Sequence, residues 1–146
     1  MKVVKNVFVT LFLITLMLSS FGCASGVKYA DYENLIPALD TQQSRLYIYR
    51  VSAFGAAIQP EVRIDNFAVC KAVPEGFIFK DVRPGSHKVQ CSTEVSRALS
   101  LTLKPGQTKY VRLDVSFGFI VGHISPKLIE EEVALKELKK CKYIGD

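Results

Sequence analysis

Histidines and cysteines are the residues of this chain best suited to catalysis or metal binding, and they are few. His87 and His123 could offer two imidazoles to a metal ion, but no third ligand stands at a recognisable spacing from either. No CxxC pair, GxSxG elbow or phosphate-binding glycine loop occurs. Ser86 directly precedes His87, and neighbours on a strand point to opposite faces, which disfavours a Ser–His pair. We therefore predict no catalytic residue, no metal and no cofactor.

Cys23 has a more specific chemistry. It follows two lysines and an apolar run from Val7 to Leu18, an arrangement typical of a secretory signal peptide. The run is shorter than the roughly 20 residues that a membrane-spanning helix needs. The stretch Ser20-Phe21-Gly22-Cys23-Ala24 resembles the lipobox of bacterial lipoproteins, although Ser20 stands where leucine is usual. We expect cleavage before Cys23 and lipidation of its thiol and amino group.

Lipidation would attach the protein to a membrane, because several acyl chains on one residue exceed the two signals that stable anchoring needs. Ala24 follows Cys23 where an aspartate would favour the inner membrane, so we expect an outer-membrane lipoprotein that faces the periplasm. Cleavage at a neighbouring bond would instead give a soluble secreted or periplasmic protein. The expected organisation is a signal helix over residues 1–22, a lipidated amino terminus and tether with one helical turn over 23–44, and one domain over 45–146.

Three cysteines remain in the mature chain, and export would permit disulfides. Cys70 and Cys91 fall on predicted strands that flank one intervening strand. The spacing leaves open whether they form a disulfide or stay small buried hydrophobes. Cys141 lies in the predicted carboxy-terminal helix.

Turn residues divide the domain into about seven short strands, which predicts a mainly β protein with a single antiparallel, immunoglobulin-like β-sandwich. The clearest alternation places His87, Val89 and Cys91 on one face of a strand that follows the Pro84-Gly85 turn. From Glu130 the run EEEVALKELKKCK has acids first and lysines last, which predicts a short helix packed on the sandwich. The expected strands are Leu46–Val51, Glu61–Asp65, Phe67–Lys71, Phe77–Val82, Ser86–Thr93, Leu99–Leu103 and Thr108–Ser116.

Two loops are apolar where surface loops are usually polar, namely Ser52–Ala57 and Phe117–His123. Exposed together, Phe54, Phe119 and Ile120 would form a partner surface; alternatively they plug an open end of the sandwich. The whole chain has a formal net charge of +5, but its late lysines follow a predicted helix and lack interleaved aromatics, so we expect no nucleic-acid partner.

Four stretches carry a family resemblance. The segments LYIYRVSAFGAAIQPEVRID, GFIFKDVRPGSHKVQCSTE, TKYVRLDVSFGFIVG and ALKELKK resemble the bacterial proteins grouped as domain of unknown function 2846. PGSHKV by itself is less specific, because PEGA-type β-sandwich modules use the same turn and alternating strand. The resemblance implies a small exported, often lipoprotein-like sandwich with no established activity, and it supplies no catalytic residue.

These observations predict a lipid-anchored, non-enzymatic interaction module of the cell envelope. Its expected partners are the membrane, through the lipid on Cys23, and an envelope protein; no oligomeric state is predicted. The alternative is a small-ligand binder or enzyme that uses the loop end formed by Ser52–Ala57 and Phe117–His123.

Overall fold

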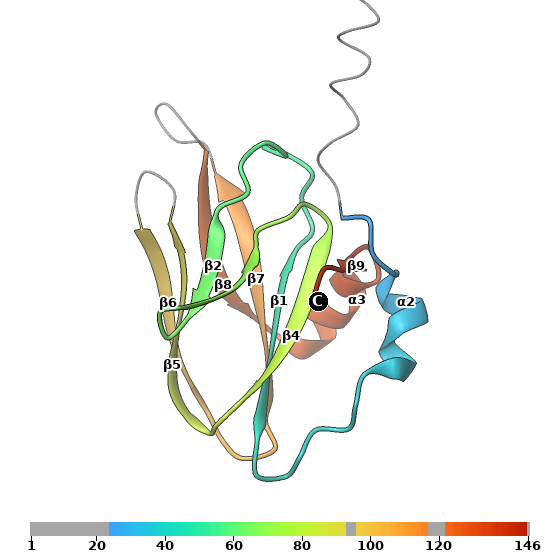
Figure 1. The fold of residues 1–146 in the computed structure, drawn as a ribbon, viewed down its shortest axis with the longest axis vertical. Coiled ribbons are helices and arrows are strands. Elements are labelled where there is room, and N and C mark those ends of the chain that lie inside the picture. Colours follow the sequence, from blue (N-terminus) through green and yellow to red (C-terminus); the bar gives the residue numbers. More distant parts are fainter. Residues whose placement is uncertain (1–23, 93–95, 117–121, 146) are drawn as a thin grey trace, which may run out of the picture.

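The chain forms two β-sheets with short helices outside one of them (Figure 1). The computed structural model describes residues 24–92, 96–116 and 122–145. Within these ranges the strand orders are β8-β7-β1-β4-β9 and β3-β2-β5-β6. The elements are α2 (Tyr29–Tyr32), the 3₁₀ turn η1 (Glu33–Leu35), β1 (Ser44–Arg50), β2 (Glu61–Ile64), β3 (Phe67–Lys71), β4 (Gly76–Val82), β5 (Gly85–Ser92), β6 (Ser96–Leu103), β7 (Thr108–Ser116), β8 (His123–Ile129), α3 (Glu131–Leu138) and β9 (Lys142–Tyr143).

Strand β1 lies in the middle of the five-stranded sheet and is buried on both faces. Leu46 and Ile48 join a hydrophobic cluster to which both sheets contribute, including Val62 and Val89 of the facing sheet. Residues of opposite parity, Tyr47 and Tyr49, lie in a second cluster beneath α2 and α3. Because successive side chains of a strand point to opposite faces, those of β1 contribute alternately to two hydrophobic cores.

Turn chemistry sets most strand ends. Asp65 and Asn66 both have positive φ, at 50° and 73°, as the central residues of a two-residue hairpin loop of type I′ require. Gly106 has φ of 71° directly after Pro105, and the turn there separates β6 from β7. The seven predicted strands are accordingly present, with ends shifted by up to three residues.

The expectation of a purely antiparallel fold with about seven strands is wrong in two respects. Strands β1 and β7 pair in parallel, as do β4 and β9. Residues 123–129 form the strand β8, where no strand was predicted, because Pro126 was expected to close the apolar loop Phe117–His123. Pro126 stands opposite Leu113, and it is tolerated because β8 is at the sheet edge, where a missing N–H need not break a ladder.

The segment before β1 packs against the domain. Ala24 is buried, and its N–H donates to the carbonyl of Pro74 at 2.9 Å. Tyr29 is also buried, with its ring edge-on to Phe77 at a centroid distance of 5.3 Å. The single helical turn expected here is α2, continued by η1. The signal segment lies outside the described residues, and none of the helices within them is both long and apolar enough to span a bilayer.

Candidate functional site: a hollow beside β7 and the loop after β1

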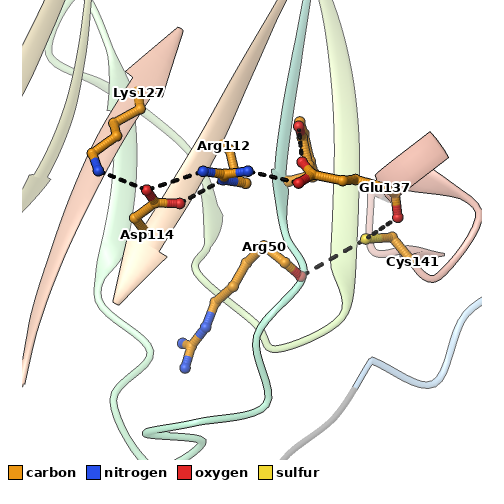
Figure 2. A network of polar contacts seen from close by, with 7 residues as sticks. Arg50, Arg112, Asp114, Lys127, Glu137 and Cys141 are labelled. Carbon is orange, nitrogen blue, oxygen red and sulfur yellow. Dashed lines mark hydrogen bonds and ion pairs between the residues drawn. The ribbon is translucent and has the colours of Figure 1, made fainter. Parts of the chain in front are cut away.

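A hollow of about 400 Å³ lies over β7, bounded by α3, β8 and the start of the loop after β1. Ion pairs join its charged lining residues into a chain (Figure 2). Arg112 donates from Nε to Oδ1 of Asp114 at 2.6 Å and from Nη1 to Oε1 of Glu137 at 2.6 Å. Lys127 reaches Oδ2 of Asp114 at 2.9 Å, and the Tyr49 hydroxyl donates to Oε2 of Glu137 at 2.7 Å.

The network brings together four elements. Tyr49 comes from β1, Arg112 and Asp114 from β7, Lys127 from β8 and Glu137 from α3. Arg112 and Asp114 share a strand face because they are two residues apart. The contacts fix the helix against the sheet, and sequence reasoning missed them because spacing alone does not show which side chains of separate elements meet.

The ionisation states are held by these contacts. Hydrogen bonding to Asp114 and then Glu137 outweighs burial and raises the pKa of Arg112. Burial by itself would raise the pKa of Asp114, but hydrogen bonds from Arg112 and Lys127 lower it. Burial raises the pKa of Tyr49, and its hydrogen bond to Glu137 adds to the rise. The network joins two basic and two acidic side chains, so the hollow is polar and its formal charges balance.

The two histidines considered as metal ligands, His87 and His123, lie in different sheets. His87 of β5 shares a hydrogen bond with Asp65 through Nδ1 at 2.6 Å and contacts the carbonyl of Arg83 through Nε2 at 2.7 Å. Ser86 instead pairs with the Thr102 hydroxyl at 3.2 Å, in keeping with the opposite facing of neighbours on a strand. His123 begins β8. Across the ranges described, no three His, Cys, Asp or Glu side chains gather in a way that could hold a metal ion.

Cys70 and Cys91 lie on either side of β2, both in register with Val62. The strand expected between them was Phe77–Val82, but that strand is β4 of the other sheet, and β2 lies between the two cysteines instead. Both residues are free thiols, as is Cys141. Adjacent strands are about 4.8 Å apart, so the two cysteines are about 10 Å apart across β2, whereas disulfides need Cα atoms within about 7 Å.

Arg50 organises the loop after β1. Its side chain is fully buried and donates hydrogen bonds to five backbone carbonyls at 2.6 to 3.1 Å. Phe54 projects from this loop and is 53% exposed, whereas Phe119 and Ile120 lie outside the described residues. The sequence offered one sign of this buried cation: Arg50 has the same alternation as Leu46 and Ile48, so it lies on the same strand face as these apolar residues. The carbonyl acceptors are those of Ser52, Phe54, Gly55, Ile58 and Ala72.

The fold and these contacts define a small two-sheet β domain with a charge-paired hollow and an apolar loop at one end. The chain belongs to a family described as "Protein of unknown function (DUF2846)", whose profile matches residues 40–124. An uncharacterized protein of Haemophilus influenzae is 27% identical over 142 residues, covering 94% of this chain and 84% of that protein. That similarity extends beyond the residues matched by the family profile.

Proposed function

We propose that the protein is a lipid-anchored, non-enzymatic binding module of the bacterial cell envelope, held in the outer membrane through Cys23 and facing the periplasm. The observation that carries this proposal is the lipobox-like stretch Ser20–Ala24 after an apolar run. The docking of Ala24 on the domain supports it, because a modified residue 23 would then stand beside a folded body.

A finer fold assignment accompanies the proposal: an immunoglobulin-like or PEGA-like β-sandwich. Its support is the hydrophobic cluster shared by the facing sheets. Such a scaffold suits binding through loops or strand edges, since its rigid core can present either. An envelope protein is the partner proposed in addition to the membrane.

Metabolic labelling with radioactive palmitate tests the anchor. The unaltered full chain should incorporate label and fractionate with outer membranes, whereas Cys23→Ala should do neither. Cys70→Ala is the matched control, because it removes another cysteine and should keep the label. Incorporation that persists in Cys23→Ala, or a labelled protein in the inner membrane, would contradict the proposal; an unlabelled soluble protein would support the secreted or periplasmic alternative.

A second candidate function is favoured by one observation: Ser52 of the apolar loop also lines the hollow, whose volume of about 400 Å³ falls in the range of small-ligand sites. The paired charges suit a small zwitterionic ligand, which would exchange its own ammonium and carboxylate groups for parts of the network. A thermal-shift screen with free amino acids tests this idea. Saturable stabilisation that is lost in Arg112→Gln would support it, and the absence of any stabilisation would remove it.

A further inference from the structure

The chain leaves the domain at a fixed point. Ala24 is 3% exposed and is held by its hydrogen bond to Pro74. Consecutive Cα atoms are about 3.8 Å apart, so an anchor on the residue before Ala24 would be attached close to this part of the surface. A lipid on Cys23 would bring the domain within one residue of the bilayer.

The next residues hold this exit point in place. The carbonyl of Val27 accepts from the N–H of Tyr143 at 2.7 Å, and the N–H of Tyr29 donates to the carbonyl of Cys141 at 2.9 Å. A Cβ atom on Gly26 would overlap the carbonyl of Tyr143, which shows how closely the backbones approach. The amino-terminal segment is therefore fastened to β9, and β9 pairs in turn with β4.

The loop after β1 lies at the same end of the domain as this exit point (Figure 1). Arg50 is in register with Gly76, and Ala72 donates its N–H to the carbonyl of Pro60 at 2.9 Å. Residue 72 is two positions from Pro74, the residue that holds Ala24. The exit point and the loop are thus joined through the turn between β3 and β4.

This loop has an unusual surface for one that faces water. Residues 51–60 contain no charged side chain, and Ala53, Phe54 and Ala57 are exposed. The backbone of the loop is held in place, because the buried Arg50 guanidinium donates hydrogen bonds to its carbonyls. An exposed aromatic on a rigid, uncharged loop is suited to the headgroup and acyl-chain boundary of a bilayer.

Lysines lie beside the exit point. Lys28 forms a β-bridge with Lys142, which itself pairs with Gly76, and Lys28 is exposed. Lys139 and Lys140 are exposed just before β9. Glu75 is an acidic residue next to β9, since its backbone carbonyl accepts from the N–H of Lys142 at 2.8 Å. Lysines near a membrane surface are attracted to anionic headgroups.

We infer that this end of the domain is a membrane-contact surface, with Phe54 entering the interface of a phospholipid bilayer while Lys28, Lys139 and Lys140 lie over its headgroups. The inference rests on the proposed anchor at Cys23. This contact would orient the domain on the membrane. The turns at 83–84 and 104–107 lie at the opposite end of the domain (Figure 1), so they would face away from the bilayer.

The sequence contains no tryptophan, so a single introduced indole reports on one place. Phe54→Trp probes the proposed contact, and Phe67→Trp is the matched control on β3, where Phe67 is 77% exposed. The lipidated full chain would be placed in vesicles of phosphatidylethanolamine and phosphatidylglycerol, with and without brominated acyl chains. We expect at least about twofold stronger quenching and a blue-shifted emission for Phe54→Trp relative to Phe67→Trp, because only an indole at the interface meets the brominated chains.

Co-flotation with the vesicles separates the two ways of failing. If the lipidated protein floats but both indoles are quenched equally, the orientation is wrong and the anchor stands. If it is neither lipidated nor floated, the anchor and the orientation fail together. Ala53→Trp, at the exposed neighbouring position, repeats the test should Phe54→Trp fail to fold, and it should be quenched more strongly than Phe67→Trp.

Discussion

Arg50 shows how one side chain can hold a loop that has little core of its own. The guanidinium offers five N–H donors in a fixed geometry, and four backbone carbonyls of the loop and that of Ala72 accept from them. These carbonyls would otherwise be buried without donors, which costs about 1 to 3 kcal/mol for each group left unpaired. The cation therefore replaces the hydrogen bonds that a strand or helix would have provided.

Arg50→Met should lower the free energy of unfolding by at least about 3 kcal/mol, because it leaves several buried carbonyls without donors. Arg63→Met is the matched control: Arg63 pairs with Glu61 at an exposed position, and such pairs contribute about 0 to 1 kcal/mol. Urea unfolding followed by circular dichroism measures both. Equal unfolding midpoints for the two variants would contradict the role given to Arg50.

His87 should make stability depend on pH. Burial by itself would lower its pKa, but the hydrogen bonds to Asp65 and to the Arg83 carbonyl raise it above the ordinary value of 6.5. A raised pKa means that the stabilisation is complete below pH 6.5 and is lost as the pH rises through the folded-state value. Asp65 limits this stabilisation at low pH. Burial by itself would raise the pKa of Asp65, but hydrogen bonds from His87 and the Lys88 amide lower it. The stabilisation that depends on the ionised Asp65 carboxylate is therefore lost only as the pH falls through this lowered pKa.

The stability difference between the unaltered protein and His87→Gln should therefore be larger near about pH 5.5 than near about pH 8.5, as measured by urea unfolding. Ser86→Ala is the control, because the hydroxyl contact it removes does not titrate in this range. If the stability difference between the unaltered protein and His87→Gln is the same at both pH values, the charged imidazolium does not stabilise the contacts with Asp65 and the Arg83 carbonyl.

At the scale of elements, the strands were predictable and their partners were not. The turns at Asp65-Asn66 and Pro105-Gly106 fix where strands begin and end, and both can be read from local sequence. Alternation shows which residues share a face but not which strand lies alongside, so the parallel pairing of β1 with β7 was missed. Strand β8 was missed because proline is disfavoured inside most strands, and the sequence does not show that Pro126 lies on an edge strand, where it is tolerated.

The candidate site was harder to predict than the fold. Arg112 and Asp114 could be placed on one face of a strand, but Glu137 and Lys127 join them only through the packing of α3 and the pairing of β8. The apolar loop made Phe54 either part of a partner surface or a plug of the open end, and the side chain is 53% exposed. Its position beside the exit of the chain depends on the docking of residues 24–28, which no local pattern indicates.

Gly26→Ala tests that docking. A methyl group at residue 26 would overlap the carbonyl of Tyr143, so the segment should separate from β9. The amide of Tyr143 should then exchange faster, because its acceptor on Val27 is displaced. Hydrogen exchange measured by mass spectrometry on peptides covering β9 detects the change, with Ser25→Ala as the exposed control. Unchanged protection in Gly26→Ala would mean that the close approach does not exist in solution.

At the scale of the whole molecule, the thiols report on global packing. Burial raises the pKa of Cys70, Cys91 and Cys141 to about 12 in each case, so little reactive thiolate is present near neutral pH. All three side chains belong to or pack against one of the two hydrophobic clusters. Their reactivity should therefore depend on the opening of the domain.

We expect iodoacetamide at about pH 8 to leave these three thiols unmodified in the native protein and to alkylate all of them in urea without reductant. Mass spectrometry of the proteolysed protein counts the adducts. Two unmodified cysteines in the unfolded, unreduced chain would reveal the disulfide that the separation across β2 argues against. Rapid alkylation of the native protein would contradict the burial of the thiols.

The central position of β1 also affects when the protein can fold. Its edge toward β7 is completed only when residues 108–112 arrive, although β1 itself is near the start of the domain. Contacts between such distant parts of a chain form slowly, whereas a local hairpin such as β5–β6 can form early. A chain that crosses a membrane amino terminus first would consequently remain loosely structured, and able to pass through a translocation channel, until most of its length had been delivered.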